Sequence, residues 1–453
     1  MSFLGTFASS RRLSALLAAF AFIAAGCTQL TRYPYLTDAT TTSATINFAT
    51  NLGSPAPVVA YGRPSDGCGG RSMAATVTPI TVGSTSEYQH KAVLNGLSAG
   101  ISYCYRMSQS GVDLLGSDAS PTFVAPPATG SSASFSFAVL GDWGAGTSDE
   151  SNVLGRIASS PAKFVMTVGD NVYNSGTQTE YGDLSGGNVF APNYWKPVGT
   201  TKPVYLAQGN HGFTQNLPYL QNWPEPTVSQ ASHGRLQQDS YCCIPTMAAS
   251  HTYASAWYAF DWGSARFYVL EAAWSDSNGG YQGDFDAHWN GPVSGCAACG
   301  TELQWLQSDL AAHAGTSMKF AFFHYPLHSD SSSQPSDTYL DGSSALEGVL
   351  AHNGVRIVFN GHAHIYERNL PQIAGTPMVS YVTGGGSAAL GSVHCSSFDA
   401  YAIGSSSACH APVPTSTSQV FHYLLVTVNG KQVTVTPVNE NGNTFDVKTY
   451  AFP

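Results

Sequence analysis

The chain has 453 residues, of which 43% are hydrophobic and 10% charged, and its formal net charge is −10. This length and hydrophobic fraction predict two or three domains, each with its own core. Nucleic acid is bound mainly through Lys and Arg side chains that neutralise phosphates, so the acidic balance argues against nucleic acid as a partner.

The N-terminal stretch predicts export from the cell. Residues 1–26 are typical of a signal peptide, with Arg11-Arg12 as its positive start and residues 13–25 as an apolar stretch too short to span a bilayer comfortably. Residues 24–27 resemble a bacterial lipoprotein cleavage box, which predicts a lipid anchor on Cys27. The alternative is cleavage nearby and a soluble exported protein. Either way, we expect a periplasmic, cell-surface or secreted protein of bacterial type.

The cysteine count agrees with export. Nine cysteines less Cys27 leave eight, and an even number in an exported chain favours disulfides. We expect Cys68 to pair with Cys104 and Cys395 with Cys409. The C-x-x-C at residues 296–299 leaves a zinc or redox site open, although a structural disulfide is the better interpretation because no second C-x-x-C accompanies it. The middle four cysteines are Cys242, Cys243, Cys296 and Cys299.

Residues 31–127 predict an all-β module. Polar and apolar residues alternate over 43–49 and in 102–107, and residues 57–61 and 88–94 are further strand candidates. This module contains no cluster of catalytic residue types, so we interpret it as a brace or a binding surface. A linker rich in Pro, Gly and Ser follows at 125–134.

The second domain is predicted to run from residue 133 to residue 453 and to alternate strands with helices. Five short apolar runs, typical of central strands covered on both faces, are each followed within a few residues by side chains able to bind metal. Ligands in open α/β sheets gather beyond the carboxyl ends of the strands. The five pairs of run and motif are 135–140 with GDWG at 141–144, 164–168 with GDNVY at 169–173, 203–207 with GNHG at 209–212, 319–323 with HYP at 324–326, and 355–359 with NGHAHIYER at 360–368.

Other segments of this domain predict its helices, further strands and the loops around the site. Leucines at helical spacing predict helices over 301–313 and 344–353. Residues 258–271 are typical of paired strands, and 421–436 of a segment that closes a sheet. A strand and a glycine loop at 381–387 are expected to approach the site, and two long insertions, 174–193 and 222–250, to wall it.

The side chains in the five motifs form a coherent donor set. Oxygen and imidazole ligands without sulfur favour iron, manganese or zinc over copper(I) or an iron–sulfur cluster. One carboxylate can bridge two ions, which lie about 3.5–4 Å apart in two-metal sites. Taken singly, each residue also has an ordinary structural interpretation as a loop cap, a turn or a core residue. The candidate ligands are Asp142, Asp170, Tyr173, Asn210, His324, His362 and His364.

The motif series G-D-x-G, G-D-x-x-Y, G-N-H, H-x-P and G-H-x-H-x-Y-E-R, from Asp142 to Arg368, resembles the metallophosphoesterases of the calcineurin-like superfamily. Tyr173 in the second motif narrows the resemblance to purple acid phosphatases. The resemblance implies a four-layer α-β-β-α sandwich, preceded by a fibronectin type III-like β-sandwich. It also implies an exported enzyme that hydrolyses phosphate monoesters, so that its partner is a small phosphoester. The alternatives are a phosphodiesterase of the same fold and a non-catalytic surface lipoprotein with a structural metal site.

The resemblance also implies roles for individual residues. An iron(III) ion would be held by Asp142, Asp170, Tyr173 and His364, and the iron–phenolate bond would give a visible colour. A second, divalent ion (iron, zinc or manganese) would be held by Asp170, which bridges, and by Asn210, His324 and His362. His211 would contact phosphate or protonate the leaving group.

Four residues near these motifs need separate comment. The family usually has Asp or Glu after G-N-H, but Gly212 stands here, which puts the tuning of His211 in doubt. His328 could face phosphate, although we favour a solvated loop histidine. Glu367 and Arg368 are expected to be structural rather than catalytic.

Overall fold

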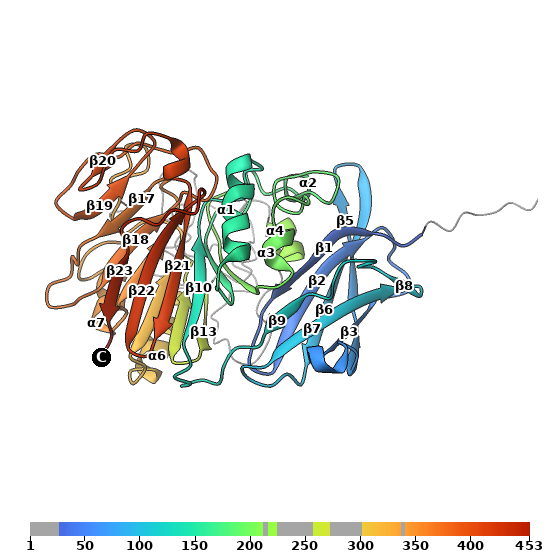
Figure 1. Cartoon of the computed structure of the whole chain (residues 1–453). Coiled ribbons are helices and arrows are strands. Elements are labelled where there is room, and N and C mark those ends of the chain that lie inside the picture. The colour runs from blue at the N-terminus through green and yellow to red at the C-terminus, as the bar shows by residue number, and fades with distance from the viewer. Residues whose placement is uncertain (1–26, 212–215, 224–256, 272–300, 337–339) are drawn as a thin grey trace, which may run out of the picture.

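The computed structural model describes residues 27–211, 216–223, 257–271, 301–336 and 340–453. The predicted signal peptide, Gly212, the four middle cysteines and most of the 222–250 insertion lie outside the described residues. Within those ranges, no helix is both long enough and apolar enough to cross a membrane. Figure 1 shows two β-rich parts side by side, with the N-terminal part in blue and the last strands in red.

The N-terminal part is a β-sandwich. Alternating side chains such as Ile46, Phe48, Tyr105 and Met107 form its core between two sheets. The four predicted strands are present, together with five strands that were not foreseen, at residues 30–37, 71–74, 76–82, 112–113 and 122–124. Cys68 and Cys104 form the predicted disulfide. One sheet holds β1 (Leu30–Thr37), β2 (Ser43–Thr50), β6 (Thr85–Asn95) and β5 (Thr76–Val82), and the other holds β4 (Arg71–Ala74), β3 (Val58–Gly62), β7 (Ser102–Gln109), β8 (Val112–Asp113) and β9 (Thr122–Val124), with the short helix η1 (Pro64–Asp66) after β3.

The second part contains two facing sheets. The first continues the sheet of β1 through one parallel pairing, Thr37 with Val204, and so joins both parts of the chain. Its further strands are β12 (Val204–Ala207), β11 (Val165–Val168), β10 (Phe135–Leu140), β21 (His422–Asn429), β22 (Gln432–Asn439) and β23 (Lys448–Ala451). The second sheet runs β13 (Tyr258–Trp262), β14 (Ala265–Val269), β15 (Met318–Phe322), β16 (Ile357–Asn360), β18 (Val379–Thr383), β17 (Tyr366–Asn369), β19 (Asp399–Ile403) and β20 (Ala408–Cys409).

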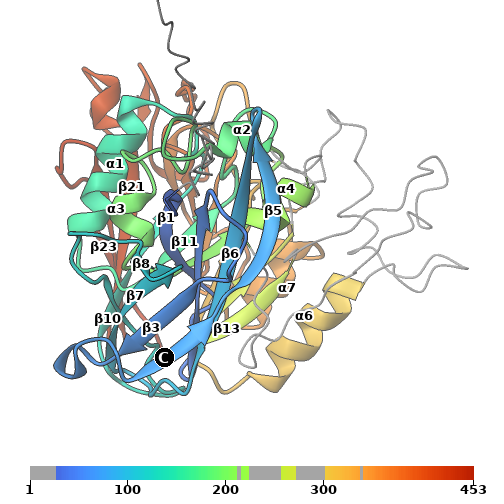
Figure 2. The same ribbon diagram turned by 90° about the vertical axis from the view of Figure 1, so that its right-hand side faces the viewer.

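Side-chain alternation along the central strands explains the layers. On β10, Phe137 and Val139 pack into the core between the two sheets, whereas Ala138 and Leu140 pack under the helices on the outer face. Figure 2 shows α1 (Ser148–Ser159) and α3 (Lys196–Gly199) on one side of the sheets and α6 (Thr301–Ala312) and α7 (Leu346–His352) on the other. The predicted four-layer α-β-β-α order is therefore confirmed. Further helices are α2 (Gln178–Tyr181), α4 (Asn216–Asn222) and the short η3 (Thr417–Gln419).

Helix α1 was missed from the sequence although its signals are present. Thr147 caps it by accepting a hydrogen bond from the backbone N–H of Glu150, as the T-x-x-E pattern favours. Val153, Leu154 and Ile157 are buried at helical spacing against the outer face of the first sheet. The helix covers the strands that carry the first two aspartate motifs.

The N-terminal sandwich is fixed to the second part by buried polar contacts. Arg32 on β1 donates to Gln178 Oε1 at 2.9 Å and to Asn222 Oδ1 at 2.5 Å. Tyr105 on β7 donates to the carbonyl of Thr200 at 2.8 Å. These contacts agree with a bracing role for the module, because they reach α2, α4 and the turn that follows α3.

Candidate functional site

Two buried aspartates begin the site at neighbouring strand ends. Asp142 follows β10 and Asp170 follows β11, each directly after a glycine. Their φ angles are 56° and 47°, a left-handed conformation that Asp tolerates better than most residues. Both side chains are almost fully buried, at 0% and 1% exposure. The parallel pairing of β10 with β11 therefore places the two carboxylates next to each other.

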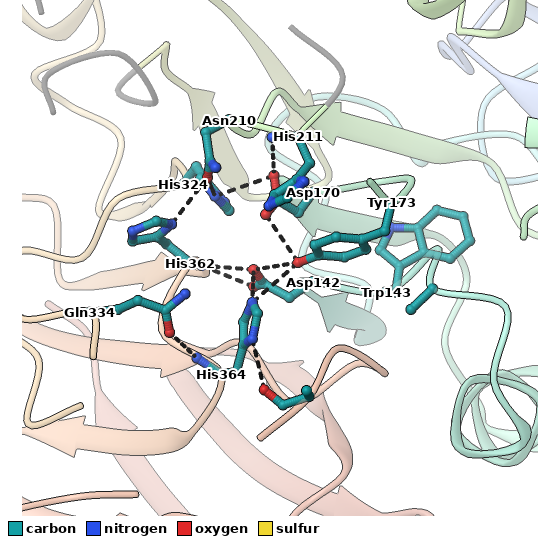
Figure 3. A network of polar contacts seen from close by, with 12 residues as sticks. Asp142, Trp143, Asp170, Tyr173, Asn210, His211, His324, Gln334, His362 and His364 are labelled. Atoms are coloured by element: carbon teal, nitrogen blue, oxygen red, sulfur yellow. Dashed lines mark hydrogen bonds and ion pairs between the residues drawn. The ribbon is translucent and has the colours of Figure 1, made fainter. Parts of the chain in front are cut away.

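The first group of donors surrounds the Tyr173 hydroxyl. That oxygen lies 3.2 Å from Asp142 Oδ1, 3.0 Å from Asp170 Oδ2 and 3.2 Å from His364 Nε2 (Figure 3). His364 Nδ1 contacts the carbonyl of Ala389 at 2.9 Å, which holds its other nitrogen toward the cluster. We call Asp142, Tyr173 and His364 the tyrosine group.

The second group surrounds the Asn210 side-chain oxygen. His324 Nε2 lies 2.8 Å from Asn210 Oδ1, and His362 Nδ1 lies 3.0 Å from it. His324 Nδ1 is held by the carbonyl of Val168 at 2.8 Å. We call Asn210, His324 and His362 the asparagine group; it uses residues from both sheets, because Asn210 follows β12 whereas the histidines follow β15 and β16.

Asp170 lies between the two groups. Its Oδ2 faces the Tyr173 hydroxyl at 3.0 Å, and its Oδ1 lies 3.4 Å from His324 Nε2. The backbone N–H of His211 donates to the same Oδ1 at 2.8 Å. The carboxylate therefore presents one oxygen to each group, which is the geometry that a bridging ligand needs.

His211 borders the cluster without joining either group. Its ring lies 4.4 Å from the Tyr173 ring, measured between centroids. Its Nδ1 lies 2.6 Å from the carbonyl of Asn174, at the start of an insertion that we expected to wall the site. A carbonyl only accepts hydrogen bonds, so Nδ1 carries the proton in the neutral ring and Nε2 is the nitrogen left for a ligand.

Burial and mutual charge set the protonation of the cluster. Burial, followed by the charges of Asp142 and Asp170, raises the pKa of the Tyr173 hydroxyl well above its usual value. Burial alone would raise the pKa of Asp170, but the charge of His324 outweighs it and lowers that pKa. Burial and the neighbouring His324 lower the pKa of His362, which keeps that ring neutral. Burial would lower the pKa of His324, but the charge of Asp170 raises it to about 9. Metal ions bind ionised carboxylates and neutral imidazoles, so His324 would release its proton when a metal ion binds.

Glycines allow the loops to approach this closely. A Cβ added at Gly209 would lie 2.1 Å from Asp170 Oδ1, and one at Gly361 would lie 2.6 Å from Asp142 Oδ2. Gly384, in the predicted glycine loop, is equally tight, with 2.0 Å to the carbonyl of Ala363 and 3.0 Å to Asp142 Oδ2. The glycine loop thus approaches the site as expected, where it packs behind Asp142.

Gln334 and His328 differ from what the sequence predicted. Gln334 Oε1 accepts a hydrogen bond from the backbone N–H of His364 at 3.2 Å, and no motif singled Gln334 out (Figure 3). The preference for a solvated His328 is wrong, because this ring is buried and its Nε2 lies 2.9 Å from Glu347 Oε1. A carboxylate from α7 thus holds that ring inside the protein.

Glu367 and Arg368 have structural contacts, although not with each other. Arg368 forms a two-pronged ion pair with Asp446, with distances of 2.7 and 2.9 Å. Glu367 is buried and its Oε2 accepts from the backbone N–H of Asp330 at 2.8 Å. Cys27 is an exposed free cysteine, and Cys395 and Cys409 form the second predicted disulfide.

Two protein-family models match this chain. A model described as calcineurin-like phosphoesterase matches residues 135–366, and one described as purple acid phosphatase N-terminal domain matches residues 33–137. Among curated proteins, purple acid phosphatase 22 of Arabidopsis thaliana is 24% identical over 328 residues, which are 71% of this chain and 63% of that protein. Phosphoenolpyruvate phosphatase of Allium cepa is 24% identical over 300 residues, 63% of this chain and 51% of that protein. The chain thus spans between about half and two thirds of these relatives' length.

Solved structures share the fold. The purple acid phosphatase PPD1 from yellow lupin (Lupinus luteus) seeds matches with a TM-score of 0.64 and 18% identity, over 92% of this chain and 74% of that one. A structure of PhoD matches with a TM-score of 0.56 and 13% identity, over 92% and 89%. Both likenesses extend across the β-sandwich and the two-sheet part together.

Proposed function

This chain belongs to the calcineurin-like phosphoesterase family, and we propose that it is an exported enzyme that hydrolyses phosphate monoesters at a dinuclear metal centre. The observation that carries the proposal is the convergence of seven side chains from five strand ends on one point. Asp170 presents its two oxygens to two separate donor groups. A structural metal site is usually one closed set of four ligands, so two groups that share a carboxylate favour a catalytic pair.

The donors fit two metal ions. In the tyrosine group the donor atoms lie 3.2–3.4 Å apart, and in the asparagine group 2.8–3.0 Å. Ligands at about 2.0–2.2 Å from one ion lie at such separations from one another. We propose that Asp142, Tyr173, His364 and Asp170 hold an iron(III) ion. Asn210, His324, His362 and Asp170 would hold a divalent iron, zinc or manganese ion.

Phosphoryl transfer depends mainly on positioning and on neutralisation of charge. When bound, the two metal ions would supply positive charge for the phosphoryl oxygens and would activate the attacking water. The chain's own contribution is at the leaving group. His211 is held by Asn174 at Nδ1 and by the ring of Tyr173, which leaves Nε2 for the substrate. When the ring carries a second proton, on Nε2, that nitrogen would donate it to the leaving oxygen. The Asn174 carbonyl orients the ring where the family usually has a carboxylate after the histidine.

Export is the second part of the proposal. The disulfides Cys68–Cys104 and Cys395–Cys409, both within the described residues, are typical of an oxidising compartment outside the cytosol. Cys27 is exposed and lies three positions before Leu30, where β1 begins. We propose that it carries the lipid anchor.

The test is hydrolysis of an aryl phosphate by the purified chain, with and without a chelator. We expect turnover that the chelator removes and that added iron with zinc or manganese restores. Asp170→Ala removes the proposed bridge and should abolish turnover and metal pairing. Asp118→Ala is the matched control, since that side chain is 49% exposed and contacts Lys196 at the surface. Full activity of Asp170→Ala would show that the bridge is wrongly assigned.

The same assay separates the alternatives. Faster turnover of an aryl phosphodiester than of the monoester would favour a diesterase of the same fold. No turnover with any metal would favour a surface lipoprotein whose metal site is structural.

A further inference from the structure

A second group of carboxylates lies where β17, β19 and the segment after His324 meet. Asp330 comes from the segment that follows His324, Glu367 lies on β17 and Asp399 on β19. Their side chains are 0%, 0% and 4% exposed. One oxygen from each lies within 4.8 Å of the others. None of the three belongs to the site described above.

The hydrogen bonds of this group satisfy only half of its oxygens. The backbone N–H of Asp330 donates to Glu367 Oε2 at 2.8 Å. The backbone N–H of Ser396 donates to Asp330 Oδ2 at 3.1 Å and to Asp399 Oδ2 at 2.7 Å. Within the described part of the chain, Asp330 Oδ1, Glu367 Oε1 and Asp399 Oδ1 are buried and accept no hydrogen bond.

The side-chain oxygen of Asn369 is also buried and without a hydrogen-bond donor among the described residues, and it is uncharged. Asn369 follows Glu367 by two residues on β17, and the two side chains are hydrogen-bonded to each other. The amide nitrogen of Asn369 contacts the carbonyl of His328 and Ser380 Oγ, both at 3.2 Å. Its buried Oδ1 accepts no hydrogen bond from any described residue. Four buried oxygens therefore lack a donor in one small region.

Positive charge is also scarce there. In the described ranges, no Lys or Arg forms an ion pair with these three carboxylates. His394 is the histidine that approaches them: its Nε2 lies 3.8 Å from Asp330 Oδ1, and its side chain is 58% exposed. Burial, followed by the neighbouring Asp330, raises the pKa of Asp399 to about 7. Burial likewise raises the pKa of Glu367 well above its usual value. Buried carboxylates without a counter-charge are unfavourable, so the group must take up either protons or a cation.

We propose that Asp330, Glu367 and Asp399, together with the carboxamide oxygen of Asn369, bind a hard divalent cation, and that this cation is calcium. The donor atoms are all oxygen, which excludes the softer metals as preferred occupants. Calcium binds oxygen at about 2.3–2.6 Å, so its ligands lie within about 5 Å of one another, as one oxygen from each of these three carboxylates does. Magnesium gives up its water reluctantly, which disfavours it in a site this buried.

The position of the group gives the cation a structural role next to the catalytic site. It would tie the segment after His324 to β17 and β19, beside the Cys395–Cys409 disulfide. The same segment carries Gln334, which accepts from the backbone N–H of His364. Calcium would therefore hold one of the loops that position the tyrosine group.

The experiment is a calcium titration of the full chain loaded with its catalytic metals and stripped of calcium by dialysis. We expect calorimetry to detect one calcium ion per chain, and a saturating concentration to raise Tm by about 2–5 °C. Magnesium at the same concentration should give less than half of that shift. Asp399→Asn should lose both the binding and the shift. Asp170→Asn should keep the calcium-dependent shift, because it alters only the catalytic cluster.

The opposite outcomes overturn the proposal. If the wild-type chain binds no calcium and its Tm does not respond, the group instead shares protons. In that case Asp399→Asn would also leave the stability unchanged or raise it. If Asp399→Asn fails to fold, Glu367→Gln replaces it, and the wild-type titration decides without any variant. Loss of the shift in Asp170→Asn would assign the calcium to the catalytic cluster and also refute the proposal.

Discussion

Replacing Gly209 by alanine tests whether close backbone approach holds the bridging carboxylate in place. The added Cβ would lie 2.1 Å from Asp170 Oδ1 and 2.2 Å from Asp170 N, whereas ordinary contact begins at 3.4 Å. Either the carboxylate or the Asn210 loop must therefore move by about 1.3 Å. Overpacking of this kind costs about 1–3 kcal/mol of stability. A misplacement of about 1 Å at a reacting centre lowers the rate by about 100-fold.

Three measurements on Gly209→Ala check this reasoning: metal content per chain, kcat on an aryl phosphate, and the free energy of unfolding. We expect fewer than two metal ions, a kcat lower by about 100-fold, and the modest loss of stability given above. Gly155→Ala is the matched control, because a Cβ there meets nothing within 4 Å in α1. That control should gain about 0.5–1 kcal/mol and keep full activity. Wild-type metal content and activity in Gly209→Ala would refute the close-approach argument.

Three further changes have expected outcomes. Tyr173→Phe should remove the visible absorption of an iron–phenolate bond while metal analysis still finds two ions; retained colour would exclude Tyr173 as a ligand. Replacing Cys395 and Cys409 by serine opens a loop with a sequence separation of 14 and should cost about 3 kcal/mol by denaturant unfolding, and an unchanged midpoint would contradict this. Burial lowers the pKa of His422 to about 4, so the unfolded chain takes up this proton first as pH falls. About 3 kcal/mol of stability, fully present above pH 6.5, should therefore be lost by pH 4, and His422→Gln should flatten this slope in unfolding experiments at both pH values.

The motif-bearing strand ends were predictable because their signals are local. An apolar run followed by a glycine and a polar residue, such as Gly141 with Asp142, marks a buried strand and the turn after it in consecutive residues. Repeating that pattern in one chain predicts convergence, since parallel strands end at the same edge of a sheet. The seven candidate ligands were found in this way, and the structure places them in one cluster. Their roles as ligands remain a proposal.

The features that could not be predicted from the sequence depend on contacts between segments that are distant in the chain. The Asn174 carbonyl, which orients His211, is a backbone group and has no sequence signature. His328 was misjudged because its partner, Glu347, lies on a helix 19 residues later. The second carboxylate group spans Asp330 to Asp399, and contacts between distant segments bring its members together: the pairing of β17 with β19, and the bridge of Ser331 with Val393.

The central claim is that one cluster of side chains holds two metal ions that share Asp170. Anomalous scattering from crystals of the purified chain, recorded at the iron and zinc absorption edges, tests it most directly. The proposal predicts two peaks about 3.5–4 Å apart, one beside Tyr173 and the other beside Asn210, with Asp170 between them. A single peak, or peaks remote from these residues, would contradict it.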